Sequence, residues 1–174
     1  MRIRPYVDAD IADVERMSAQ IVREGDVFPF HSVTGVLDYW FSPGSRVYVA
    51  EHKGRVAGSY VIKPNLPDRC SHIANAGYMV DLEGRGNGIG SAMGAHSLEQ
   101  AARLGYLGMQ FNIVVATNER AVRLWKKLGF KVIGRVPDAF RINSSELVDV
   151  LIMFRRLAPP ELHDDGRTMQ SLDS

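Results

Sequence analysis

The chain has a single cysteine, Cys70, among its 174 residues. An internal disulfide is therefore excluded. The sequence also lacks an apolar run of membrane-spanning length, and its first residues do not have the charged and apolar regions of a signal peptide. These absences favour a protein of the reducing cytoplasm.

Neither sign of charge predominates, because 21 Lys and Arg residues and 20 Asp and Glu residues give a net charge of +1. The basic residues are scattered, so we expect neither nucleic acid nor an anionic membrane as a partner. The five histidines do not have the spacing of metal ligands, and we predict no metal. A small molecule is the expected partner, and a homodimer is left open.

Apolar residues, in contrast, make up 45% of the chain, which is enough for the core of one domain. We expect a single domain over residues 1–157. After Ala158-Pro159-Pro160 the composition becomes polar and acidic. We interpret residues 158–174 as a tail whose composition favours disorder.

Strand-like and helix-like segments alternate along this domain. Apolar residues with helical spacing begin at Ile11 and predict a helix that ends at Gly25. Lys53-Gly54 is typical of the turn of a β-hairpin. The other expected elements are a strand over 2–7, a helix capped by Ser32, the two hairpin strands over 46–51 and 55–63, a strand over 72–80, a helix over 88–104, a strand over 107–116, a helix over 118–128, and strands over 130–136 and 147–157.

A glycine-rich segment, residues 84–90, follows the fourth expected strand and opens a helix. Glycines allow successive backbone N–H groups to point into one concavity, and the helix N-terminus adds free donors and the positive end of its dipole. The segment is therefore typical of a pyrophosphate cradle. It has neither the Gly-Lys-Ser/Thr of a P-loop nor the glycine register of a dinucleotide fold. An ordinary flexible loop is the alternative interpretation.

The order of these elements resembles the GCN5-related N-acetyltransferase (GNAT) fold over roughly residues 1–157. Two segments carry the resemblance. Residues 85–90, Arg-Gly-Asn-Gly-Ile-Gly, match the family's Gln/Arg-x-x-Gly-x-Gly/Ala loop for the pyrophosphate of acetyl-CoA, and residues 118–130 match its second motif. The resemblance implies an α/β (α+β) fold with a mixed central sheet of about six to seven strands, splayed between strands 4 and 5 and flanked by about four helices. It also implies acetyl-CoA as the co-substrate.

The same resemblance assigns the cofactor contacts. Backbone groups at the end of the fourth strand pair with the pantetheine arm in this family, as an added strand would. The implied cofactor-binding residues are Met79, Val80, Arg85, Gly86, Asn87, Gly88, Ile89, Gly90, Asn118 and Trp125. Asn118 is also expected to cap a helix. Gly77 is interpreted either as the β-bulge that splays the fourth strand from the fifth or as a weak strand residue.

Three residues depart from the common pattern of the family. Many members have a tyrosine that protonates the leaving thiolate where this chain has Trp125, and an indole N–H does not titrate usefully. Many also place a glutamate base on the fourth or fifth strand, where this chain has Asn75 and Asn112. We therefore expect a site without the usual acid and base.

A narrower resemblance accounts for the asparagines. Residues 71–80, 111–118 and 129–137 are similar to fungal azetidine-2-carboxylate and proline-analogue N-acetyltransferases, in which asparagines on the splayed strands bind the substrate carboxylate and orient its ring nitrogen. Asn75 and Asn112 match these positions and are the candidate catalytic residues. Independently, we expect the Asn112 amide to be buried between Phe111 and Ile113, where an unpaired amide costs about 1–3 kcal/mol, so substrate is one candidate partner. Backbone or water is the other.

We expect an acetyl-CoA-dependent N-acetyltransferase in which a small-molecule amine attacks the thioester directly. A covalent relay through Cys70 is disfavoured, because no histidine and carboxylate can be placed around it from the sequence. Two alternatives stay open, a non-catalytic acyl-CoA-binding sensor and a protein or peptide N-acetyltransferase. The sequence has no cluster of carboxylates that would mark a peptide groove.

Overall fold

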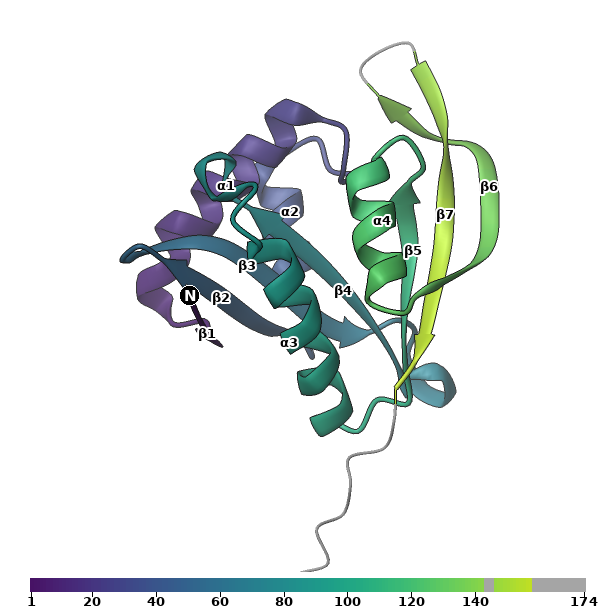
Figure 1. Ribbon diagram of the computed structural model, residues 1–174, viewed down its shortest axis with the longest axis horizontal. Helices are drawn as coiled ribbons and strands as arrows, with labels where there is room; N and C mark the ends of the chain where they lie inside the picture. The colour runs from purple at the N-terminus through teal and green to yellow at the C-terminus, as the bar shows by residue number, and fades with distance from the viewer. Residues whose placement is uncertain (143–145, 158–174) are drawn as a thin grey trace, which may run out of the picture.

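The computed structural model describes residues 1–142 and 146–157, which form one mixed sheet covered by helices on both faces (Figure 1). Its seven strands lie in the order β1-β2-β3-β4-β5-β7-β6, which agrees with the expected fold class. The tail predicted from residue 158 onward lies outside the described residues. The elements are β1 (Arg2–Pro5), α1 (Ile11–Glu24), α2 (Val33–Trp40), β2 (Arg46–His52), β3 (Arg55–Pro64), β4 (Ile73–Val80), α3 (Ile89–Arg103), β5 (Gly108–Val115), α4 (Glu119–Lys127), β6 (Lys131–Ile142) and β7 (Glu146–Arg156), with short 3₁₀ turns at Asp8–Asp10, Asp68–Cys70 and Leu82–Gly84.

The helices begin and end where the sequence signals predict. Gly25 ends α1 in a left-handed conformation, and its N–H donates to the carbonyl of Ile21. The Ser32 hydroxyl accepts from the N–H of Gly35 at 3.1 Å and caps α2. Local capping therefore sets the boundaries of both helices on this face of the sheet.

The core has two layers, one on each face of the sheet. Helices α1 and α2 pack on one face, where the buried side chains include Met17, Trp40 and Met79. Helices α3 and α4 pack on the other face over a cluster that includes Met93 and Phe111. Each helix buries one apolar stripe against the sheet, which is the usual source of stability for such an architecture.

Strands β4 and β5 run parallel and are paired only at their start. The paired residues are Ile73 with Gly108 and Ala74 with Met109. Beyond these two pairs the strands diverge, and Figure 1 shows the gap widening toward the C-terminal ends of both strands. The expected splay between the fourth and fifth strands is present.

The bulge lies in β5 and not at Gly77. Strand β4 pairs with β3 without a register shift at Gly77, which stands opposite Val61. An added Cβ at Gly77 would lie 3.2 Å from the ring of Trp40, so close packing against α2 explains this glycine. In β5 the register with β7 shifts between Phe111 and Val114, which adds one residue to β5 near Asn112.

Strand β6 is longer than the predicted 130–136, since it continues to Ile142. Pro137 follows directly after the predicted end, and proline cannot donate to a ladder. Here β6 is an edge strand, and its register with β7 shifts between Val136 and Phe140, so the proline lies within a bulge. The strand resumes beyond the bulge.

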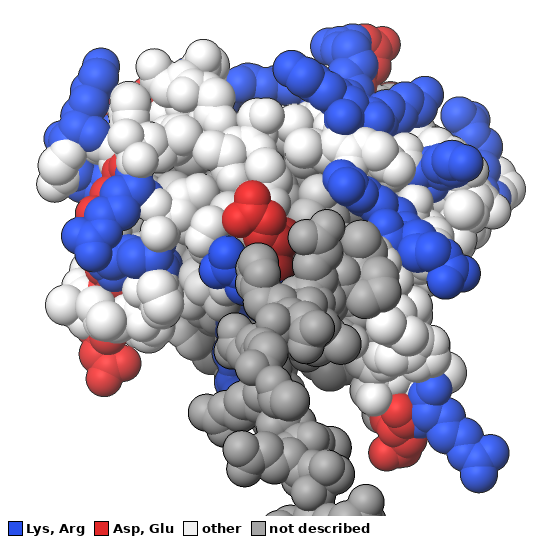
Figure 2. All heavy atoms as spheres, turned by 60° about the horizontal axis from the view of Figure 1, so that its bottom comes forward, with Lys and Arg blue, Asp and Glu red and all other residues white. Residues whose placement is uncertain are grey.

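No helix in the described ranges combines the length and apolar character needed to cross a membrane. Figure 2 shows Lys and Arg side chains on both sides of one face of the molecule, more of them toward the upper right, with few acidic side chains among them.

Candidate active site

A central cavity of about 950 Å³ opens in the gap between β4 and β5. It runs from the glycine-rich loop, along β4, to the side chains of Asn75 and Asn112. Its volume is that of a site for a cofactor or other sizeable ligand. Of the sequence-predicted site residues, it is lined by Asn75, Met79, Val80, Arg85, Gly86, Gly88, Ile89, Gly90, Asn112, Asn118 and Trp125, and not by Asn87.

The glycine-rich loop presents free backbone donors at the start of α3. Gly86 and Gly88 have φ angles of +85° and +77°, which only glycine adopts without strain. Within residues 1–142 and 146–157, no group accepts a hydrogen bond from the N–H of either glycine. Because α3 begins at Ile89, these donors lie next to the positive end of its dipole. This arrangement can hold an anion such as a pyrophosphate.

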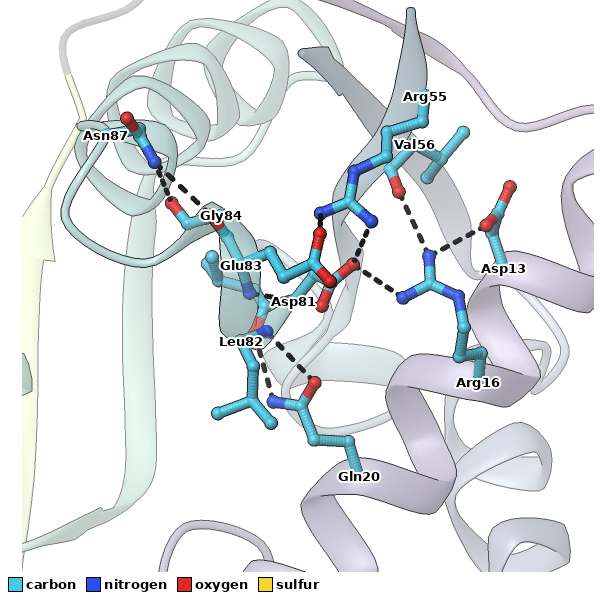
Figure 3. A network of polar contacts seen from close by, with 11 residues as sticks. Asp13, Arg16, Gln20, Arg55, Val56, Asp81, Leu82, Glu83, Gly84 and Asn87 are labelled. Atoms are coloured by element: carbon cyan, nitrogen blue, oxygen red, sulfur yellow. Dashed lines mark hydrogen bonds and ion pairs between the residues drawn. The ribbon is translucent and has the colours of Figure 1, made fainter. Parts of the chain in front are cut away.

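Side chains of helix α1 and strand β3 contact the turn that leads from β4 into the glycine-rich loop (Figure 3). Asp81, at the end of β4, is only 4% exposed and accepts from Arg16 Nη1 at 2.5 Å, with Arg55 Nη1 at 3.4 Å. Gln20 accepts from the N–H of Leu82 at 3.0 Å, and its amide lies 3.4 Å from the carbonyl oxygen of Val80. The sequence analysis did not identify Arg16 or Gln20, because only tertiary packing brings α1 to this turn.

Two polar residues of the loop have partners inside the protein. The Arg85 guanidinium forms an ion pair with Glu24 at 2.5 Å, which joins the cradle to the end of α1. The Asn87 amide turns back onto the loop and lies 3.3 Å from the carbonyl oxygen of Gly84. Asn87 therefore stabilises the turn and does not face the cavity.

Backbone N–H and C=O groups of successive β4 residues point alternately toward β3 and toward the gap between β4 and β5. Asn65 N–H donates to Ile73 O at one end of the β3–β4 ladder, and Asp81 N–H donates to Ala57 O at the other. Strand residues alternate, so the odd-numbered residues of β4, including Met79, bond to β3. The N–H and C=O groups of Tyr78 and Val80 point toward the splayed side. The backbone of Tyr78 and the N–H of Val80 are therefore available to pair with an added strand, whereas the backbone of Met79 is not.

The two candidate asparagines meet at a third one. Asn75 Nδ2 donates to Asn65 Oδ1 at 3.0 Å, and Asn112 Nδ2 donates to the same oxygen at 2.7 Å. The expectation that Asn112 is buried is wrong, because the β5 bulge leaves Asn112 exposed and Ile113 46% exposed. Burial therefore gives no reason for Asn112 to require a partner; Asn112 instead lines the cavity with its exposed side chain.

Trp125 and Asn118 have structural partners as well as cavity positions. Trp125 is 8% exposed and packs against Tyr78 and Phe111, with ring centroids 4.7 and 4.8 Å away. Asn118 Oδ1 accepts from the N–H of Ala121 at 3.1 Å and caps α4, as expected.

An aromatic wall closes the cavity on the α1–α2 side. It consists of Phe28, Phe30 and Tyr39, which the sequence analysis did not single out. Burial raises the pKa of the Tyr39 phenol to about 12, so the phenol stays protonated at neutral pH. Lys63 Nζ lies 3.4 Å from the centre of the Tyr39 ring, and burial lowers its pKa. This wall makes the α1–α2 side of the cavity largely apolar.

The part of the chain that the structure describes thus combines a backbone anion cradle with an unpaired strand side along one cavity, an arrangement that can bind an extended phosphorylated ligand. Comparisons with known proteins identify the class of protein to which this arrangement belongs. The profile of the acetyltransferase (GNAT) family matches residues 14–130. The chain therefore belongs to the GNAT family of acetyl-CoA-dependent acetyltransferases.

Individual relatives agree with this assignment. The N-acetyltransferase aca1 of Schizosaccharomyces pombe is 42% identical over 94 residues, which are 54% of this chain and 45% of aca1. The L-amino acid N-acetyltransferase AaaT of Escherichia coli is 28% identical over 113 residues, 65% of this chain and 69% of AaaT. The match thus spans less than half the length of aca1.

Solved structures share the fold. A GCN5-related N-acetyltransferase from Kribbella flavida has a TM-score of 0.82 and 36% identity, covering 90% of this chain and 97% of that one. The acetyltransferase yncA of Salmonella typhimurium, solved with acetyl-CoA, has a TM-score of 0.81 and 21% identity over 91% of this chain and 94% of its own. Acetyl-CoA fits the residues present here, because in the described ranges the N–H groups of Gly86 and Gly88 have no acceptor and no heavy atom lies within 4 Å of the position of either missing Cβ.

Proposed function

We propose that this chain transfers the acetyl group of acetyl-CoA to the amine of a small amino or imino acid, with proline analogues such as azetidine-2-carboxylate as first choice. One observation carries the proposal. A single cavity joins the glycine-rich cradle to Asn75 and Asn112, so a phosphorylated cofactor and a polar acceptor can meet in it.

The cofactor occupies the end of the cavity formed by the glycine-rich loop in this proposal. Gly86, Gly88, Ile89 and Gly90 offer backbone donors, and Arg85 offers a positive charge to the pyrophosphate. Val80 and Tyr78 offer strand-like backbone groups to the pantetheine arm, for which Met79 supplies only side-chain packing. Asn118 and Trp125 flank the same cavity near the thioester.

Acetyl-CoA supplies an activated acetyl group, and the chain's own residues position the reacting amine. The Val80 N–H, on the splayed side of β4, polarises the thioester carbonyl. The amine must lose a proton, and the aromatic wall of Phe28, Phe30 and Tyr39 favours the neutral form by desolvation. Asn75 orients the nitrogen and Asn112 contacts the carboxylate. No covalent enzyme intermediate is required.

A turnover screen tests this proposal. The purified chain is incubated with acetyl-CoA and amino acids, imino acids, polyamines or peptides. Release of free thiol is followed, and each product is identified by mass spectrometry. We expect the highest kcat/KM with a small amino or imino acid. Tight acetyl-CoA binding without thiol release would instead indicate a sensor, and a preference for peptides would contradict the small-molecule acceptor.

Two single substitutions test the acceptor end. Hydrogen bonds to charged groups contribute about 1.5–3 kcal/mol. We expect Asn112→Ala to raise the KM of the amine about tenfold or more because carboxylate binding is lost, and Asn75→Ala to lower kcat because the nucleophile is misoriented. Binding of acetyl-CoA, measured by calorimetry, should survive both changes. Kinetics close to wild type for both variants would remove both asparagines from the acceptor site.

A further inference from the structure

Asn65 lies directly after β3 and joins the two strands on either side of the gap. Its backbone N–H donates to Ile73 O at 2.8 Å, at the end of the β3–β4 ladder. Its side-chain Oδ1 accepts from Asn75 Nδ2 on β4 at 3.0 Å and from Asn112 Nδ2 on β5 at 2.7 Å. One amide oxygen thus connects the two candidate acceptor residues where β4 and β5 begin to separate.

This shared oxygen sets the direction of both amides. An amide group has a carbonyl oxygen that accepts and an NH₂ that donates. If Asn75 were turned over, its own oxygen would face Asn65 Oδ1, and two acceptors would oppose each other. The same holds for Asn112, whose Oδ1 also accepts from Gln110 Nε2 at 2.8 Å. Asn112 is therefore held at both ends of its amide.

Asn75 and Asn112 differ in which part of the side-chain amide has no partner among the described residues. Among the described residues, nothing donates to Asn75 Oδ1, so this oxygen is available as an acceptor in the cavity. On Asn112 the oxygen is occupied by Gln110, and one N–H of the NH₂ group remains available. A neutral amine carries N–H donors, and a carboxylate carries only acceptors. The two residues are thus suited to the two ends of an amino acid.

We propose that Asn65 is a positioning residue that holds Asn75 with its carbonyl oxygen toward the amine of the acceptor and Asn112 with an N–H toward the acceptor's carboxylate. This inference rests on the proposed function. Asn65 is itself kept in place by its ladder hydrogen bond and by Pro64 and Pro67, which restrict the backbone on both sides. It is not among the residues that line the cavity, so it acts through the other two asparagines.

Two variants of Asn65 separate positioning from simple structural support. Asn65→Leu has a similar shape without an acceptor oxygen, and Asn65→Asp keeps an acceptor for both donors. Asn65→Leu removes the acceptor of two hydrogen bonds, from Asn75 and from Asn112. We expect it to lower kcat for the amine about tenfold or more, because Asn75 is no longer oriented, and to leave the KM of acetyl-CoA unchanged. Asn65→Asp should restore kcat to within about threefold of wild type. Leu66→Ala, in the same exposed connection, is the matched control and should have no effect on kcat.

A double substitution and an NMR spectrum provide two further measurements. Neither should change as described below if Asn65 has only a structural role. In the Asn75→Ala background, Asn65→Leu should lower kcat by less than about twofold, because the residue that it positions is already absent. In the substrate-free protein, the side-chain NH₂ resonances of Asn75 and Asn112 should shift together in Asn65→Leu and not in Leu66→Ala.

The possible failures are distinguishable. If the wild-type chain acetylates no amine, the proposed function fails and the inference fails with it. If it acetylates an amine but Asn65→Leu has wild-type kinetics and unchanged NH₂ resonances, only the inference is overturned. Full additivity of Asn65→Leu with Asn75→Ala would also overturn it.

Discussion

Gly88 holds a φ angle of +77° at the start of α3, where no heavy atom lies within 4 Å of its missing Cβ. A valine there can be accommodated sterically, but it adopts a left-handed conformation at a cost of about 1–2 kcal/mol. Its side chain would project from the cradle and hinder the close approach of an anion. We expect Gly88→Val to remain folded and to bind acetyl-CoA at least about tenfold more weakly by calorimetry, because a weaker contact of 1.4 kcal/mol corresponds to that factor.

Gly54 provides the matched control for this substitution. It has a φ angle of +79° in the β2–β3 turn, and its missing Cβ also has no neighbour within 4 Å. Gly54→Val should therefore lose a similar amount of stability in thermal denaturation with no loss of affinity. Equal affinities in the two variants would show that the loop does not hold the cofactor.

Trp125 is a core residue as much as a site residue. Its ring packs against Tyr78 and Phe111. We expect Trp125→Phe to lower the free energy of unfolding by about 1–3 kcal/mol through lost packing, while kcat stays within about fivefold of wild type. Steady-state kinetics on the folded variant provide the measurement. A general acid contributes about a hundredfold or more, so a loss of that size would mean that the indole takes part in the chemistry.

At the scale of elements, α1 supports the glycine-rich loop through Arg16. The guanidinium contacts Asp81, whose side chain is almost fully buried, and also donates to the Val56 carbonyl at 3.2 Å (Figure 3). Removing one partner of a buried charge leaves the other charge uncompensated. Here Arg55 remains near Asp81, so we expect a partial loss.

We expect Arg16→Met to destabilise the protein by about 1–3 kcal/mol and to weaken acetyl-CoA binding, because the loop is less well held. Chemical denaturation and calorimetry measure the two effects. The control is Arg123→Met, which breaks an exposed pair with Glu119 on α4 and should cost no more than about 0.5 kcal/mol. If Arg16→Met behaves like this control, α1 does not stabilise the loop.

The β5 bulge and the β4–β5 divergence act together as elements of the site. Among the described residues, the divergence leaves the backbone of Tyr78 and the N–H of Val80 unpaired, and the bulge exposes Asn112 at the cavity. Neither strand alone would place an amide beside free backbone donors.

At the scale of the whole molecule, we expect a partly buried histidine, His96, to make stability depend on pH. His96, on α3, has its Nδ1 2.5 Å from the hydroxyl of Tyr60 on β3, and partial burial lowers the pKa of His96. The unfolded chain, with a histidine pKa of about 6.5, takes up a proton before the folded protein does. The unfolded state is therefore favoured as the pH falls below about 6.5, and the stabilisation from neutral His96 is complete only above that pH.

We expect the Tm of the wild-type protein to fall between pH 7 and pH 5, and His96→Gln to reduce this fall because glutamine can accept from Tyr60 without titrating. His72→Gln, at an exposed position before β4, should leave the pH dependence unchanged. Identical pH profiles for wild type and His96→Gln would assign the dependence to other groups.

Local signals in the sequence were sufficient to predict most of the helices, strands and turns of this protein. Helical periodicity, the Ser32 cap, the Lys53-Gly54 turn and the glycine-rich loop each depend on residues close together in the chain, and their elements form where predicted. The order of elements, with the segments at 85–90 and 118–130, led to the fold class and the family.

Tertiary structure decided the parts of the site that depend on contacts between distant residues. Asn65 and Asn112 are 47 positions apart, and Arg16 and Asp81 are 65 apart, so no local pattern could pair them. Ladder register turned the backbone of Met79 away from the gap, and the β5 bulge exposed an asparagine whose apolar neighbours had suggested burial. The sequence by itself determined which elements form and which chemical groups are present, because short-range sterics and capping govern both. Packing of the sheet and helices determined which groups meet and which way each one faces.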